Sequence, residues 1–191
     1  MRIAIDAGHG PMTRGKQTVD GMKEYSFNSA AAEELSRLLQ QYHNVQTLFT
    51  HHHSMDVPLA ERAAAANRWK ADLLISIHAN AHGNGEAWNS ANGIETFVHT
   101  SRPPAAVEAA KSIQKQLIFI TNRRDRGVKA ADYFLLRKTA MTAILCECGF
   151  MTNKTEAALL RTHSYRQDCA RAICTGIAEC YGLKPKNLSS C

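Results

Sequence analysis

The stretch Met1-Arg2-Ile3-Ala4-Ile5-Asp6-Ala7-Gly8-His9-Gly10 decides the fold class of this chain. Its apolar run predicts a buried β-strand over residues 2–6, and a histidine between two glycines follows where that strand ends. Apolar side chains such as Ala31, Leu35 and Leu38 then recur at helical spacing over residues 24–42. A strand that leads through a loop into an amphipathic helix is the opening unit of an α/β protein.

The same alternation continues along the chain and predicts a single α/β domain. Short apolar runs alternate with longer helical patterns, an order that builds a mostly parallel, twisted six-stranded sheet with helices on both faces. The predicted strands cover residues 2–6, 45–49, 73–78, 94–99, 133–136 and 143–147. The predicted helices cover residues 24–42, 58–70, 104–120, 155–161 and 165–181, with Pro58 and Pro104 in first turns.

The formal net charge of +6 favours an anionic partner, which could be nucleic acid, a membrane surface or a cell-wall polymer. The densest basic run, Arg123-Arg124-Asp125-Arg126, is short and lacks interleaved aromatic residues, so we interpret it as a solvated loop. No run of about 18 apolar residues occurs. We therefore expect neither a nucleic-acid partner nor integral membrane contact.

The cysteines indicate a chain that needs no disulfides. Their spacings match neither paired zinc knuckles nor a small secreted disulfide scaffold. We expect mostly buried, reduced thiols at Cys146, Cys148, Cys169, Cys174, Cys180 and Cys191.

Four side chains with catalytic or metal-binding capacity are predicted to meet at one edge of the sheet. His9 follows the first strand, His78 ends the third and Glu147 ends the sixth. Glu24 begins the helix that follows the His9 loop, so it belongs to the same edge. In open parallel sheets, ligands bind beyond the carboxyl ends of the strands, where these residues converge.

Two imidazoles and one carboxylate suit a catalytic zinc ion, because three protein ligands leave one coordination position for water. His9, Glu24 and His78 are the expected ligands of Zn²⁺. A further carboxylate is then needed to move a proton from water to the leaving nitrogen. Glu147 fits this role, since Cys146 and Cys148 point to the other face of its strand.

Each residue also has an ordinary structural explanation. A lone His9 or His78 is more often a hydrogen-bonded packing residue than a ligand, and Glu24 suits a helix start. The shared edge favours the metal site. By contrast, the side chains of His51-His52-His53 are consecutive and cannot all converge, so we interpret them as part of a solvated loop.

The motifs around these residues resemble those of the zinc-dependent N-acetylmuramoyl-L-alanine amidases of the amidase-3 family, especially phage endolysin and cytosolic autolysin catalytic domains. They span nearly the whole chain. In chain order they are Ile5-Asp6-Ala7-Gly8-His9-Gly10, Lys23-Glu24-Tyr25-Ser26-Phe27-Asn28, Ser76-Ile77-His78-Ala79-Asn80, Asp125-Arg126-Gly127-Val128-Lys129 with Leu135-Leu136-Arg137, and Cys146-Glu147-Cys148-Gly149-Phe150-Met151-Thr152-Asn153. Two positions depart from the pattern, with His51 where the family often has Arg and Thr142 where it often has Pro.

The resemblance implies cleavage of the amide between the lactyl group of N-acetylmuramic acid and L-alanine in peptidoglycan, which causes cell-wall lysis. It also implies substrate contacts at Asn80 and Arg137. Two alternatives remain open. One is a zinc carboxypeptidase or deacetylase that uses the same metal chemistry on another carbonyl, and the other is a wall-binding module that has lost catalysis. The released products distinguish the enzymes, and the intact set of four residues argues against the module.

Residues 1–183 are expected to form the catalytic domain, and residues 184–191 a tail or the start of a linker. The tail is equally compatible with an ordinary terminus and with a linker to a cell-wall-binding domain absent from this chain. We expect a monomer whose partner is peptidoglycan. Because the first strand begins at once, we expect synthesis in the cytoplasm without a signal peptide, and access to the wall after release by a holin or by lysis.

Overall fold

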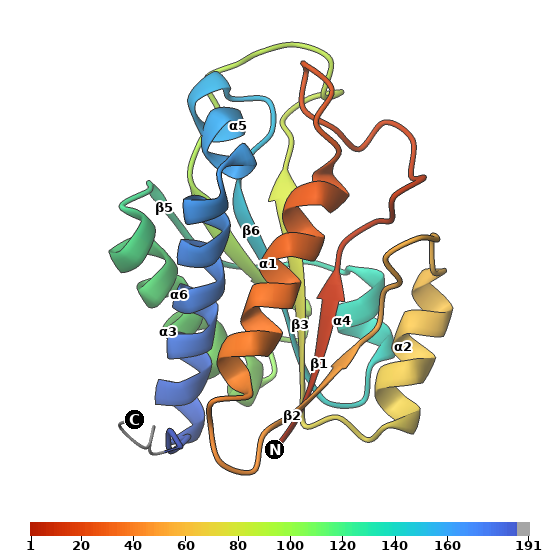
Figure 1. Cartoon of the computed structure of the whole chain (residues 1–191), viewed down its shortest axis with the longest axis vertical. Coiled ribbons are helices and arrows are strands. Elements are labelled where there is room, and N and C mark those ends of the chain that lie inside the picture. The colour runs from red at the N-terminus through yellow and green to blue at the C-terminus, as the bar shows by residue number, and fades with distance from the viewer. Residues whose placement is uncertain (187–191) are drawn as a thin grey trace, which may run out of the picture.

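The computed structural model describes residues 1–186, in which six strands form one mixed sheet with helices on both faces (Figure 1). The strands are β1 (Arg2–Ala7), β2 (Gln46–Phe49), β3 (Leu73–Asn80), β4 (Ile94–Val98), β5 (Asp125–Ala130) and β6 (Thr142–Phe150). The helices are α1 (Glu24–Leu39), α2 (Leu59–Arg68), α3 (Pro104–Thr121), α4 (Phe134–Lys138), α5 (Lys154–Arg161) and α6 (His163–Tyr181). None of these helices is long and apolar enough to cross a bilayer.

The strand order across the sheet is β2-β1-β3-β6-β4-β5. Strands β2, β1, β3 and β6 are mutually parallel, whereas β4 runs antiparallel to β6 and carries β5 parallel to itself. The predicted α/β class, with a mostly parallel six-stranded sheet, is therefore confirmed. The carboxyl ends of β1, β3 and β6 meet at one edge, as the convergence argument required.

Each face of the sheet has its own apolar core. The larger core packs side chains of β1, β3 and β6 against α1, α3 and α6, and it contains Phe27, Leu35 and Ile113 at 0% exposure. The smaller core packs β1, β3, β4 and β6 against α2 and α4, and it contains Leu74 and Leu145. Burial of both faces explains why the central strands read as continuous apolar runs.

One predicted strand is wrong. Residues 134–136 belong to helix α4, and the strand missing from the prediction is β5 at Asp125–Ala130. Leu135 and Leu136 pack against α2 in the smaller core as helical neighbours. The expected solvated loop at residues 123–126 is wrong in its second half, because Asp125 and Arg126 belong to β5.

The last described residues lie against the turn that follows α1. The amide of His43 donates to the carbonyl of Lys184 at 2.9 Å, and the amide of Lys186 donates to the carbonyl of Gln41 at 2.7 Å. The predicted tail therefore begins with a segment that bonds to the domain through Lys184 and Lys186. Its remaining residues, 187–191, lie outside the described part of the chain.

Candidate active site

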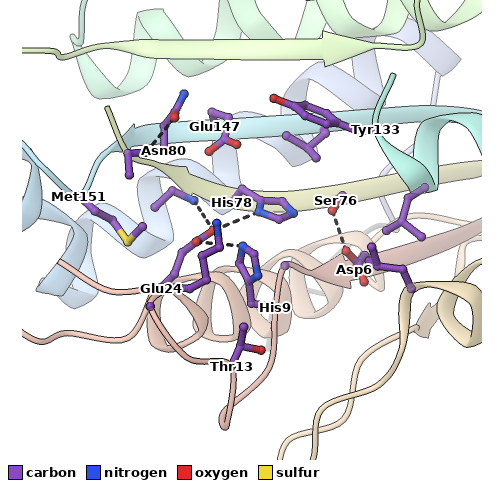
Figure 2. Close-up of a pocket in the computed structure, with 18 of the residues that line it drawn as sticks. Asp6, His9, Thr13, Glu24, Ser76, His78, Asn80, Tyr133, Glu147 and Met151 are labelled. Carbon is purple, nitrogen blue, oxygen red and sulfur yellow. Dashed lines mark hydrogen bonds and ion pairs between the residues drawn. The ribbon is translucent and has the colours of Figure 1, made fainter. Parts of the chain in front are cut away.

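The sheet face beneath α2 and α4 changes from apolar to polar along its strands. On β1, β3 and β6 the buried Ala4, Leu74 and Leu145 give way toward the carboxyl ends to Asp6, Ser76 and Glu147. Side chains two positions apart share a face, so His78 and Asn80 extend the polar row on β3. The polar part of the face lines an open cleft (Figure 2).

His9, Glu24 and His78 meet in this cleft, as predicted. His9 Nε2 lies 3.1 Å from one oxygen of Glu24, and His78 Nδ1 lies 3.0 Å from the other. One ligand atom from each residue lies within 4.8 Å of the others. The rings of the two histidines meet edge to face, with centroids 5.2 Å apart.

The carboxylate of Glu24 is fixed from behind by two further donors. The backbone amide of Ala79 and the Nδ2 of Asn28 each donate to Glu24 Oε1 at 3.1 Å. Burial alone would raise the pKa of Glu24, but the bonds to His78 and His9 hold it well below its usual range. For His78 the directions are reversed. Burial alone would lower its pKa, but the hydrogen bond and the charge of Glu24 raise that pKa to about 9.

This donor set fits a catalytic metal ion. Two imidazole nitrogens and one carboxylate oxygen can converge on a common point, and a site with three protein ligands leaves a position for water. Outer hydrogen bonds such as those on Glu24 are what orients a metal ligand.

The glycine before His9 is required by close packing. A Cβ on Gly8 would lie 2.1 Å from Cε1 of His78, so any other residue here would have to displace that imidazole ring. His9 itself has a left-handed backbone, with φ of 62°. The conformations of Gly8 and His9 thus allow the imidazole rings of His9 and His78 to lie close together.

A buried ion pair supports the same loop. Asp6 and Arg62 are almost fully buried and pair at 2.9 Å, and hydroxyls of Thr50 and Ser76 also donate to Asp6. The guanidinium of Arg62 donates to the carbonyls of Ala7 and His9. Burial alone would raise the pKa of Asp6, but Arg62 and the hydroxyls hold it below its ordinary value.

The three consecutive histidines have different environments. His52 and His53 are exposed, which matches the solvated loop that we predicted. His51 is half-buried, and its Nδ1 accepts a hydrogen bond of 3.0 Å from the amide of Ala7. That imidazole therefore fastens the end of β1 to the end of β2.

Glu147 lines the cleft with one oxygen left unused. Its side chain is 9% exposed, and its Oε2 is buried without a hydrogen-bond partner in the described residues. Burial, reinforced by the charges of Glu24 and Glu95, outweighs the opposing effect of His78 and raises the pKa of Glu147 to about 8. A carboxyl group with such a pKa can both accept and release a proton near neutral pH.

Asn80 lies in the cleft with its amide group held at both ends. Its Nδ2 donates to Glu95 at 2.7 Å, and its Oδ1 accepts from the amide of Ala81 at 2.8 Å. Arg137 is not a lining residue of the cleft. It lies on α4, where it pairs with Asp132 at 2.5 Å and stacks on Phe134, which does line the cleft.

Two residues of this region escaped the sequence analysis, namely Arg62 and Glu95. Both are charged and only 2% and 4% exposed. Buried charges are costly unless they are paired. A charged residue inside an apolar run is therefore the sequence feature that could have identified these two residues. Glu95 stands in such a run in Ile94-Glu95-Thr96-Phe97-Val98, whereas Arg62 stands among alanines and gave a weaker one.

Comparison with known proteins identifies the family. The family model for N-acetylmuramoyl-L-alanine amidase of the amidase-3 type matches residues 3–179. The chain belongs to this family. As an N-acetylmuramoyl-L-alanine amidase it is an amide hydrolase that acts on peptidoglycan, which excludes the carboxypeptidase, deacetylase and wall-binding alternatives.

Relatives and solved structures agree with this assignment. The amidase CwlM of Bacillus licheniformis is 32% identical over 96% of this chain and 70% of its own length. The endolysin of Bacillus phage SPP1 is 34% identical over 97% of this chain and 68% of its own length. The crystal structure of an N-acetylmuramoyl-L-alanine amidase from Clostridium difficile 630 superposes with a TM-score of 0.89, at 31% identity over 95% of this chain and 96% of that one.

Proposed function

We propose that the amidase is zinc-dependent, with His9, Glu24 and His78 as ligands and Glu147 as the proton carrier. The observation that carries this proposal is the unpartnered, buried Oε2 of Glu147 in the cleft that holds the ligand cluster. A buried polar atom without a partner is costly, so its retention here indicates that it serves the reaction.

In this proposal three of the residues bind the metal and the fourth transfers protons. Bound zinc would polarise the carbonyl of the scissile amide and make a water more acidic. Glu147 then takes the proton from the attacking water and delivers it to the nitrogen of L-alanine as the C–N bond breaks. Burial raises the pKa of Glu147, which favours the protonated form that delivers its proton to the leaving nitrogen.

The scissile bond joins the lactyl carbonyl of N-acetylmuramic acid to L-alanine. Asn80 is the better supported of the two substrate contacts, since its Nδ2 keeps a second hydrogen in the cleft. Arg137 would contact substrate only at the rim formed by α4.

Residues 1–183 are proposed as the catalytic domain. Several relatives are longer, and this chain spans 37% of a cell wall amidase of Bacillus anthracis and 35% of LytC of Bacillus subtilis. This supports the proposal that a wall-binding domain accompanies such a catalytic unit. The endolysin relative supports access to the wall on host lysis.

The decisive experiment is digestion of purified peptidoglycan with the zinc-loaded protein, followed by mass spectrometry of the fragments and elemental analysis of the enzyme. We expect new amino groups on L-alanine, no new reducing sugars, and one zinc per chain. Reducing ends that rise in step with lysis, or active protein without bound metal, would contradict the proposal.

A further inference from the structure

One polar group on the cleft face has no part in the reaction described above. Glu95 on β4 is 4% exposed and lies opposite Glu147 in the antiparallel ladder between β4 and β6. Residues paired in this way project to the same face. Glu95 therefore extends the polar row of the cleft one strand further toward the sheet edge.

Two cations from β5 close on this carboxylate. Arg126 Nε lies 2.7 Å from Glu95 Oε2, and Lys129 Nζ bonds to the same oxygen. Burial alone would raise the pKa of Glu95, but Lys129 and Arg126 hold it below its usual value, so the carboxyl stays ionised. Two cations thus share one carboxylate, and the group carries an excess of positive charge.

The two cations are held in place yet remain accessible. Arg126 also donates to the carbonyl of Asn92 and lies over the ring of Phe150 at 4.8 Å. The side chains of Arg126 and Lys129 are 27% and 39% exposed. A lysine ammonium has three hydrogens, and Glu95 takes one of them. Lys129 can therefore bind a second anion without leaving the first.

We propose that Lys129 and Arg126, positioned by Glu95, form a subsite for a carboxylate of the stem peptide. This inference rests on the proposed function, because it extends the same cleft. The N-acetylated glycan strand offers no anionic group beside the scissile amide, whereas the stem peptide carries free carboxylates. Excess positive charge on the cleft face thus fits the peptide arm of the substrate.

The spacing of the strands agrees with this assignment. Neighbouring strands lie about 4.8 Å apart, so the strand of Lys129 is roughly 10 Å from that of Glu147. An extended peptide advances about 3.4 Å per residue, so a carboxylate two or three residues beyond the scissile amide can reach the subsite. Glu95, on the strand between these two positions, also accepts a hydrogen bond from Asn80.

Two other cations, Arg62 and Lys16, line the cleft itself, whereas Lys129 and Arg126 lie beside it at Glu95. Arg62 is sealed by Asp6 and by backbone carbonyls, so it offers nothing to a substrate. Lys16 lies in the loop after β1, lines the cleft and has no ion-pair partner within residues 1–186. Lys16 is therefore the competing candidate that an experiment must separate from Lys129.

The test uses two synthetic muramoyl tripeptides of identical sequence. One has free carboxylates on its second and third residues, and the other has carboxamides there. For the wild type we expect a preference of about tenfold in kcat/KM for the carboxylate form, the size of one charge-assisted hydrogen bond. Lys129→Met should abolish this preference through KM and leave kcat unchanged. Lys129→Arg should retain most of it, and Lys111→Met on the exposed face of α3 should change nothing.

Three results would overturn the subsite. The first is a wild type that cleaves the two peptides equally well. This result does not depend on whether any variant folds. The second is an equal loss on both peptides in Lys129→Met, which indicates a merely structural role. The third is loss of the preference in Lys16→Met with its retention in Lys129→Met. A wild type that cleaves neither tripeptide nor polymeric peptidoglycan would instead overturn the proposed function, and the subsite with it.

Discussion

Glu147 on β6 lies directly opposite His78 on β3 in the parallel ladder between these two strands. A proposed proton carrier and a proposed metal ligand are therefore neighbours on one sheet face (Figure 2). Both side chains line the cleft, but only one of them has a partner there. His78 bonds to Glu24, whereas Glu147 Oε2 has no hydrogen-bond partner within residues 1–186. Substitutions at the two positions should consequently separate proton transfer from metal binding.

Glu147→Gln should keep zinc and fold but lose activity, because it removes a proton carrier and no ligand. Loss of a general acid–base group typically costs about 10²–10⁴-fold in rate. His78→Ala should lose activity together with zinc. Kinetics and zinc content measured side by side check this pair. If Glu147→Gln lost zinc while His78→Ala kept it, the two roles would have to be exchanged.

Removal of the metal should abolish activity and lower the melting temperature, and added zinc should restore both. A ligand that binds only the folded state stabilises it by about 2.7 kcal/mol when its concentration is 100 times the Kd. The three proposed ligands come from β3, α1 and the loop after β1, so a bound metal would tie these elements together. Thermal melts with chelator and with added zinc provide the measurement. An unchanged melt on chelation of active protein would contradict a zinc site here.

Gly8→Ala should displace the ring of His78, because the new Cβ would lie 2.1 Å from it. Disturbing the support of a metal ligand typically costs roughly 10–100-fold in metal affinity or activity. Gly83→Ala is the comparison variant, since nothing lies within 4 Å of a Cβ there and its φ of +71° adds backbone strain without a new contact. We expect the control to keep its zinc. Equal zinc affinity in both variants would show that the contact at Gly8 can relax.

The convergence of the site was predictable because it depends on local patterns. Apolar runs predict β1, β3 and β6, and the residues that end parallel strands must meet at one edge. His9, His78 and Glu147 could therefore be placed together without knowledge of any loop. Glu24 followed from the helix start that its loop leads into.

Strand β5 could not be predicted in the same way. It lies at the sheet edge, its residues are mostly half-exposed, and its sequence Asp-Arg-Gly-Val-Lys-Ala has no strand pattern. The apolar run at residues 133–136 was short enough to suit either a strand or a helix. Pairs such as Asp6 with Arg62 and Glu95 with Arg126 join distant segments, so a single sequence identifies neither partner.

All six thiols should titrate as free under denaturing conditions in protein made in a reducing cytoplasm. The five cysteines within residues 1–186 are unpaired, and Cys146 and Cys148 are fully buried on one face of β6. Burial raises the pKa of the Cys146 thiol well above its ordinary value, which makes it slow to oxidise. Cys191 lies outside the described residues. A thiol titration well below six would contradict this expectation.

Asp6→Asn should destabilise the fold in a pH-dependent way, because it leaves the Arg62 guanidinium buried without its counter-ion. Breaking such a pair costs about 3–5 kcal/mol. The pKa of Asp6 is lower in the folded protein than its ordinary value of 3.8. The ion pair therefore contributes its full stability above that value and loses it as the pH falls through the folded pKa. Urea unfolding of wild type and variant should show a wide gap at pH 7 that narrows at pH 3.

The exposed pair of Asp20 with Arg161 supplies the control for this experiment. Solvent screens that pair, so Asp20→Asn should change the unfolding free energy little at either pH. Asp6→Asn should also lower activity, since Arg62 would no longer hold the carbonyls of Ala7 and His9 in place. A gap between wild type and Asp6→Asn that stays constant from pH 7 to pH 3 would show that the charge of Asp6 is not what stabilises the loop. In that case the cost would lie in the hydrogen bonds, because Thr50 and Ser76 donate to different oxygens of Asp6 and asparagine keeps only one acceptor oxygen.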